Sequence, residues 1–217
     1  MTARHIIASL ALTSFLGALP AAAQEPKKSG LALGVRGAMG IPVGDAFTDQ
    51  SLRDTFGTTV APQVDVSWFF SRRLSLGAYF QYGFGSGPGD LCSDVVDCKS
   101  QVLRVGVDLD YHFLPDSFIA PWVGVGLGYE VAKLDVGGSS SNNWLKLEGY
   151  DLIHAHFGVD LQLTRSIAVG PYISASVGQY SEGAVRVADL ETSDELTSDE
   201  KQIHVWIQPG VRVQFRL

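Results

Sequence analysis

Three scarcities limit what this chain can be. After residue 23 it has no apolar run long enough for a membrane-spanning helix, which needs about 20 consecutive residues. Basic residues are outnumbered, 16 against 23 acidic ones, and the net charge is −7. Because nucleic-acid phosphates require clustered Lys and Arg, we expect no nucleic-acid partner. Because the chain lacks an apolar run that could form a spanning helix, it can enter a membrane only as β-strands.

Cysteine is also scarce. The only two, Cys92 and Cys98, lie close together in a segment rich in Gly, Ser and Asp. A metal site would need further ligands beside them, and the sequence offers none, so we expect no metal and no cofactor. In an exported chain, this spacing favours a local disulfide between the two cysteines.

The N-terminal residues have the pattern of a signal peptide. Arg4 provides a positive charge, residues 6–19 are apolar, and three alanines precede Gln24. This pattern predicts an export signal over residues 1–23, removed by cleavage before Gln24. The remaining residues, 24–217, have the length of one domain, which we expect to be a β-barrel.

The last stretch, residues 203–217, alternates strictly between apolar and polar residues. Leu217, Phe215 and Val213 share one face, while Arg216, Gln214 and Arg212 share the other. A membrane-spanning strand needs roughly 9–11 residues with this alternation, and both of its edges must be paired, because lipid cannot satisfy backbone groups. The pattern therefore predicts a closed barrel around this strand, and Phe215 and Leu217 are the expected assembly signal.

Seven earlier segments alternate in the same way. The eight expected strands cover residues 31–41, 60–70, 74–84, 103–113, 119–131, 153–163, 167–178 and 203–217. The expected long links are residues 44–57, 85–100, 133–148 and 181–201, and short turns lie between them. Even strand number and alternating loop length predict an all-β, eight-stranded antiparallel up-and-down transmembrane barrel with both termini in the periplasm.

The composition of the two faces indicates which one points outward. The polar face is rich in glycine, which suits the narrow interior of an eight-stranded barrel. Aromatic residues on the apolar face gather near the strand ends and form two expected girdles. The members of these girdles are Trp68, Phe70, Tyr111, Phe113 and Phe215 at one end, and Phe80, Tyr82, Phe84 and Tyr129 at the other.

These features resemble a known family. The export signal, the eight strands, the segment PWVGVGLGY at residues 121–129 and the final strand are similar to the small outer-membrane barrels typified by the OmpA transmembrane domain and OmpX. Members usually end on an aromatic residue, whereas Leu217 is last here and Phe215 precedes it by two. The resemblance implies a bacterial outer-membrane location, contact with outer-membrane lipid and lipopolysaccharide, and insertion by the barrel-assembly machinery.

Two strands offer a candidate catalytic pair. The short turn between them predicts that His156 lies opposite Ser174 and His154 opposite Ser176 on the inward face. Ser and His with an acid nearby are the groups used in acyl transfer, so a lipid A-modifying hydrolase or transferase is one hypothesis. The alternative, which we favour, is that these residues form hydrogen bonds within a filled lumen, and no catalytic residue is assigned.

Charged residues of both signs share the inward face, as a buried polar network requires. The predicted network contains Arg36, Asp65, Arg104, Asp108, Asp110, Glu130, His154, His156, Asp160 and Arg212. A small-solute or ion path through the lumen is an alternative use of these groups. The last long link is strongly acidic, so it either is simply solvated or binds cations or a basic partner.

The function expected from these patterns is a structural or surface-interaction role in the outer membrane. The long loops would be the contact surface, and the sequence does not identify their extracellular ligand.

Overall fold

The computed structural model describes residues 29–47, 50–87, 98–137, 143–188, 190–197 and 201–217. The predicted signal peptide lies outside the described residues, and so does Cys92, the predicted partner of Cys98. Both assignments therefore stay predictions. Among the described residues, no helix is both long enough and apolar enough to cross a membrane.

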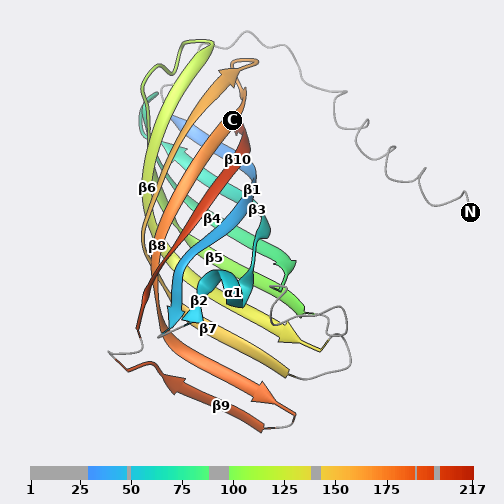
Figure 1. Cartoon of the computed structure of the whole chain (residues 1–217). Helices are drawn as coiled ribbons and strands as arrows, with labels where there is room; N and C mark the ends of the chain where they lie inside the picture. Colours follow the sequence, from blue (N-terminus) through green and yellow to red (C-terminus); the bar gives the residue numbers. More distant parts are fainter. Residues whose placement is uncertain (1–28, 48–49, 88–97, 138–142, 189, 198–200) are drawn as a thin grey trace, which may run out of the picture.

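The chain forms a closed, antiparallel, eight-stranded β-barrel (Figure 1). Each barrel strand pairs with the next along the chain, and the last strand pairs with both the first and the seventh, which closes the sheet. The barrel strands are β1 (Gly30–Phe47), β3 (Thr59–Phe69), β4 (Leu74–Ser86), β5 (Cys98–His112), β6 (Ile119–Val136), β7 (Asn143–Gln162), β8 (Ile167–Val187) and β10 (Ile203–Arg216). The predicted fold class is confirmed.

The two faces of the wall differ as the alternation predicts. In β3 every second residue is buried, and the residues between them are exposed. The outward side chains include Val35, Val64, Val107 and Val125, each about half exposed on a surface that would be costly in water but is suited to lipid. Both predicted aromatic girdles lie on this outer surface, where their side chains are exposed except for that of Tyr129, which is partly buried.

All four predicted long links contain regular structure, which corrects the sequence-based expectation. Strands β6, β7 and β8 continue into segments that we expected to be links, and β9 (Leu190–Glu195) pairs with the end of β8. Since 9–11 residues cross a bilayer, β7 with 20 residues and β8 with 21 reach well beyond it. We call the extended part of β6 to β9 the distal sheet; it comprises residues 131–136, 143–151, 178–187 and 190–195.

The distal sheet lies at the end of the barrel opposite the C-terminus, and we call this the distal end (Figure 1). Charged and polar residues interrupt the apolar alternation of these segments, and for this reason the sequence pattern predicted links rather than strands. Cross-strand hydrogen bonding nevertheless continues, because each strand keeps a neighbour.

The first predicted long link also contains regular structure. It includes the end of β1, the short strand β2 (Gln50–Ser51) and the helix α1 (Leu52–Phe56). The Ser51 hydroxyl accepts a hydrogen bond from the Arg53 N–H and caps the helix. Gly57, whose φ of 64° favours glycine, ends it.

Helix α1 closes the distal mouth of the lumen. Its residues Leu52 and Phe56 are fully buried in an apolar cluster with residues from the barrel wall. We call this cluster the distal plug, and it contains Ala46, Leu52, Phe56, Val102, Ala132, Leu134, Leu147, Tyr180 and Trp206. The lumen is therefore capped by packed side chains at the end where the distal sheet begins.

Candidate functional site

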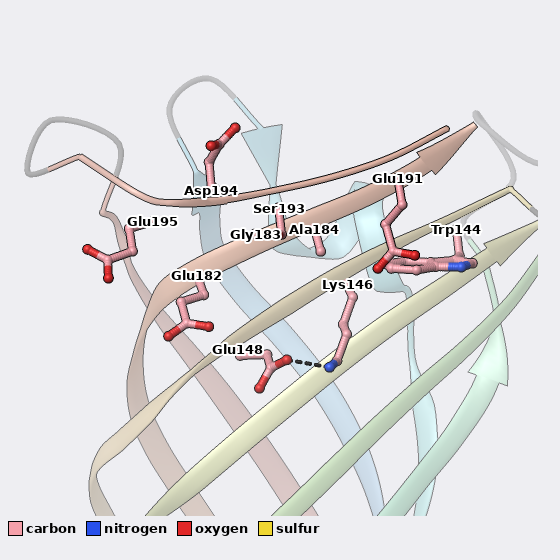
Figure 2. Close-up of a pocket in the computed structure, with 10 residues that line it drawn as sticks. All are labelled: Trp144, Lys146, Glu148, Glu182, Gly183, Ala184, Glu191, Ser193, Asp194 and Glu195. Atoms are coloured by element: carbon pink, nitrogen blue, oxygen red, sulfur yellow. Dashed lines mark ion pairs between the residues drawn. The ribbon is translucent and has the colours of Figure 1, made fainter. Parts of the chain in front are cut away.

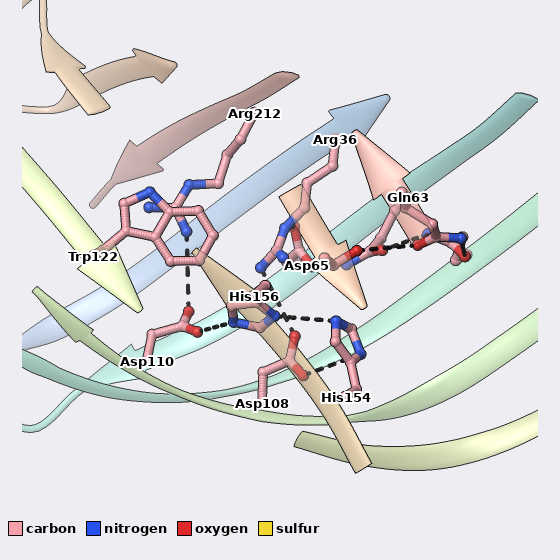
Figure 3. A network of polar contacts seen from close by, with 12 residues as sticks. Arg36, Gln63, Asp65, Asp108, Asp110, Trp122, His154, His156 and Arg212 are labelled. Carbon is pink, nitrogen blue, oxygen red and sulfur yellow. Dashed lines mark hydrogen bonds and ion pairs between the residues drawn. The ribbon is translucent and has the colours of Figure 1, made fainter. Parts of the chain in front are cut away.

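The centre of the lumen holds a polar network built across three neighbouring strands (Figure 3). In the sheet register, Asp110 of β5, Gly124 of β6 and His156 of β7 form one row. Because Gly124 has no side chain, the side chains on either side of it meet: His156 Nε2 lies 2.6 Å from Asp110 Oδ1. A glycine in the middle strand thus positions a histidine against a carboxylate two strands away.

The next row repeats this arrangement. Asp108 of β5 and His154 of β7 lie on either side of Gly126, and His154 Nδ1 is 3.8 Å from Asp108 Oδ1. The two rows are linked by His156 Nδ1 and His154 Nε2, which are 3.0 Å apart. The Asp108, His154 and His156 side chains each bring a potential metal-ligating atom within 4.8 Å of the others.

A β-bulge adds a second carboxylate beside His154. The pairing register of β7 shifts between Asp151 and Ile153, so that Leu152 and Ile153 both point outward while Asp151 points into the lumen. Asp151 Oδ2 lies 3.8 Å from His154 Nδ1. A strict period of two places Asp151 on the outer face, because the sequence does not show the bulge that changes which residues face inward.

The Arg36 guanidinium connects this centre to the opposite side of the lumen. Its Nε donates to Asp65 Oδ2 at 2.9 Å, and its Nη2 lies 3.8 Å from Asp108 Oδ2. The other oxygen of Asp65 accepts a hydrogen bond from Gln63 Nε2 at 2.6 Å. Asp65 is thus better satisfied than Asp108, which has no hydrogen-bond partner at either carboxylate oxygen among the described residues.

Arg212 forms a second ion-paired layer toward the end of the barrel that carries the C-terminus. Its Nη2 donates to Asp160 Oδ2 at 2.6 Å, and its guanidinium carbon lies 3.5 Å from the ring centre of Trp122. The Trp122 indole N–H donates to Asp160 Oδ1 at 3.2 Å. The three side chains are all at most 1% exposed, so they fill this cross-section of the lumen.

Glu130 forms a third layer, next to the distal plug. One of its oxygens accepts a 2.6 Å hydrogen bond from Arg104 Nε, and the other accepts from the hydroxyl of Tyr180 and from Trp206 Nε1. His204 Nε2 is 3.5 Å from the same carboxylate. This carboxylate is therefore compensated by a positive charge and by donors from several strands.

All ten residues of the predicted network are buried in the lumen. The structure distributes them over the three layers described above rather than in one cluster. Sequence analysis missed Asp151, Tyr180 and His204, as well as the amide side chains that connect the layers. Those amides are Gln63, Gln81 and Gln208, and Gln81 contacts both of the others.

The predicted register of the candidate catalytic pair is confirmed, since His156 lies opposite Ser174 and His154 opposite Ser176. The hydrogen bonds do not follow the register. Ser174 Oγ donates to Gln208 Oε1 at 3.3 Å, whereas His156 contacts Asp110 and His154. No serine among the described residues is bonded to either histidine, so the geometry offers no activated nucleophile.

A pocket of about 420 Å³ lies on the distal sheet (Figure 2). Its lining residues are Trp144, Lys146, Glu148, Glu182, Gly183, Ala184, Glu191, Ser193, Asp194 and Glu195. Five carboxylates and one ammonium line it, so the pocket is acidic. The ion pair with Lys146, together with the Tyr129 hydroxyl, holds the pKa of the Glu148 carboxyl below its usual value.

Three of these carboxylates lie in one row across three strands. Glu182 of β8 is directly opposite Glu148 of β7 on one side and Glu195 of β9 on the other. Like charges placed directly opposite destabilise a sheet, so the row favours the approach of positive charge. Lys146 pairs with Glu148, and Arg186, just outside the lining, pairs with Glu191. Within the described residues, Glu182, Asp194 and Glu195 have no ion pair.

The predicted assembly residues lie at the end of the barrel opposite the distal sheet. Phe215 pairs with Leu33 of β1 and Ile167 of β8, and its side chain is exposed on the outer surface. Leu217 is also exposed, and its N–H donates to the Leu31 carbonyl. Both residues are therefore available to lipid or to a protein that recognises the last strand.

Known proteins resemble this chain in structure but not in sequence. No protein-family model matches it, and a search of curated proteins found no relative. Among solved structures, Neisserial surface protein A superposes with a TM-score of 0.50 at 13% identity, over 89% of this chain and all of that one. The outer membrane protein OprG from Pseudomonas aeruginosa gives 0.51 at 14% identity, over 88% and 99%. At such identities the likeness shows the barrel fold alone.

Proposed function

We propose that this chain is a bacterial outer-membrane protein that contacts basic molecules outside the cell through the pocket of its distal sheet. The row of Glu148, Glu182 and Glu195 is the observation that carries the proposal, because it concentrates negative charge on strands that reach beyond the bilayer. We also propose that both termini are periplasmic, because the start of β1 and the C-terminus lie at the end of the barrel opposite the distal sheet.

The surroundings of the pocket support a binding role. Trp144 lies at one end of it, with the Arg186 guanidinium 5.3 Å from its ring centre. An aromatic face beside carboxylates suits Lys or Arg side chains, which gain from ion pairing and from contact with the ring. A basic peptide segment is therefore the class of partner that fits this surface.

The filled lumen argues against transport as the main function. Eight strands enclose a space only wide enough for side chains, and here the three ion-paired layers and the distal plug occupy it. A structural and surface-interaction role also agrees with the name of Neisserial surface protein A, which has this fold.

The proposal is tested with barrels in lipid nanodiscs and a fluorescent oligolysine peptide as the probe. We expect the Glu182→Gln, Glu195→Gln double variant to bind the peptide at least several-fold more weakly than wild type, with most of the difference lost at high salt. The matched control is Asp54→Asn with Asp116→Asn, which removes the same charge from exposed sites outside the pocket. Equal weakening by both double variants would contradict the assignment of the pocket.

The alternative functions require separate measurements. Planar-bilayer recordings report any conductance, and mass spectra of lipid A from cells with and without the protein report acyl chemistry. Steady open-channel current would replace the binding role with solute passage. A change in lipid A that disappears in a His154→Ala, His156→Ala variant would move the function into the lumen.

A further inference from the structure

We infer that the lumen binds one divalent transition-metal ion, such as Zn²⁺, through Asp108, His154 and His156. This inference concerns the barrel interior and is independent of the distal pocket. Two imidazoles and one carboxylate are a donor set that suits zinc and its first-row neighbours, and three protein ligands leave a further position open. The ion would connect β5 to β7 across β6.

The separation between His154 and Asp108 fits a shared ion better than it fits a hydrogen bond. His154 Nδ1 and Asp108 Oδ1 are 3.8 Å apart, which is too far for a hydrogen bond. Two ligands of a tetrahedral zinc ion, each at about 2.0–2.2 Å, lie roughly 3.3–3.6 Å apart, so a shift of a few tenths of an ångström would let an ion span this gap. The widest separation in the three-residue set, at most 4.8 Å, would have to close by up to about 1.4 Å when the ion binds.

The atoms that face this gap form no hydrogen bond among the described residues, and their other charged neighbours, Arg36 and Asp151, lie no closer than 3.8 Å. Both carboxylate oxygens of Asp108 and Nδ1 of His154 are buried without a hydrogen bond among the described residues. Asp108 is 4% exposed and His154 is 5% exposed, so water outside the barrel does not reach them. A buried polar atom without a partner is costly, and a bound cation would satisfy all three atoms at once.

The surrounding residues prepare His156 as a ligand. Asp110 accepts a hydrogen bond from His156 Nε2, so this nitrogen carries the proton and Nδ1 keeps its lone pair. A carboxylate on the far nitrogen of a metal-binding histidine fixes the ring and increases its basicity. Without an ion, the Nδ1 lone pair instead accepts from His154 Nε2 at 3.0 Å.

The excess of acidic side chains in the lumen also favours the binding of a cation. Among the described residues, six acidic side chains are buried against three arginines. The acids are Asp65, Asp108, Asp110, Glu130, Asp151 and Asp160, and the arginines are Arg36, Arg104 and Arg212. With every one of these acids ionised, half-buried Arg216 reduces the excess to two negative charges. A divalent ion beside Asp108 and Asp151 would compensate both.

The test uses the full chain, extracted in mild detergent from outer membranes of cells grown with added Zn²⁺ or Co²⁺, without a polyhistidine tag. After passage over a chelating resin, elemental analysis gives the metal content, and Co²⁺ absorption reports the ligands. We expect about one retained ion per barrel. The four histidines that follow the predicted signal peptide, His112, His154, His156 and His204, are all buried, so imidazole ligation can arise only in the lumen.

Variants then locate the site. Asp108→Asn and His154→Gln should retain no ion, and Asp110→Asn should weaken binding about 10–100-fold through its effect on His156. His112→Gln is the matched control, because it removes a buried lumen histidine outside the ligand set. Heat-modifiable gel mobility shows which variants are folded. If a ligand variant does not fold, X-ray absorption of zinc-loaded wild type tests for two imidazoles and an oxygen donor.

Three outcomes would overturn the inference. In the first, the wild-type barrel retains no ion. In the second, the His112→Gln variant loses the ion as completely as the His154→Gln variant does. In the third, the X-ray absorption spectrum shows no imidazole ligands.

Discussion

His156 and Asp110 form a 2.6 Å contact across the backbone of Gly124, although the two residues belong to strands that are not neighbours in the sheet. A side chain at position 124 would occupy the space in which their atoms meet. The glycine alternation of β6 is therefore a condition for the network in the centre of the lumen.

Gly124→Ala should consequently destabilise the barrel. The added methyl group would separate His156 from Asp110 and leave both buried groups without their partner, which costs about 1–3 kcal/mol for each group left unsatisfied. Gly37→Ala is the control, because a Cβ at position 37 meets nothing within 4 Å. Urea unfolding in detergent measures the stability of both variants. Equal unfolding midpoints would show that the close approach at Gly124 does not contribute to stability.

The Arg104–Glu130 pair should contribute far more to stability than an exposed pair. Arg104→Met leaves the Glu130 carboxylate buried without its main cation, for which we expect a loss of about 3–5 kcal/mol in unfolding free energy. Arg72→Met removes a surface pair with Asp116 and should cost about 0–1 kcal/mol. Similar values for the two variants in the same unfolding assay would contradict this.

The wild-type barrel should show no steady current in planar bilayers. The buried side chains of the Arg212 layer, the central network, the Glu130 layer and the distal plug all occupy the lumen. Phe56→Ala should remain closed for the same reason, because the layers beneath α1 are intact. It should still lose about 3–5 kcal/mol of stability from the cavity that the phenylalanine leaves. Sustained conductance of wild type would refute the closed lumen.

Replacing both Phe215 and Leu217 with Asp should prevent assembly. We propose that this rim of the last strand is the signal by which the barrel-assembly machinery recognises the chain. The variant should accumulate in a protease-sensitive form without heat-modifiable mobility. Leu114→Asp with Leu163→Asp is the control, since these leucines are also exposed at this end but lie outside the last strand. Failure of both variants would point to general loss of lipid contact.

The disulfide between Cys92 and Cys98 also remains a prediction. Protein isolated from the cell envelope, alkylated without prior reduction, should gain no label at either cysteine. Reduction followed by alkylation should label both, as peptide mass spectrometry would reveal. Labelling at both positions without reduction would exclude the bond.

The sequence determined the architecture because alternation with a period of two assigns each residue to one side of a closed wall. Arg36, Asp108 and Arg212 could thus be placed inside the lumen, and Trp68 and Phe80 outside it, from their positions alone. The opposition of His156 and Ser174 also followed from the sequence, because the short turn that joins their strands fixes the register.

Only the tertiary structure decided which of these residues interact. His156 bonds to Asp110 rather than to Ser174 because Gly124 lets side chains from non-adjacent strands meet, and such approaches depend on the curvature of the closed barrel. Asp151 faces inward only because of a bulge that the period of two does not encode. The distal sheet was missed for a related reason. Its strands extend beyond the lipid-facing band, where the sequence no longer alternates between apolar and polar residues, and cross-strand hydrogen bonds hold them together.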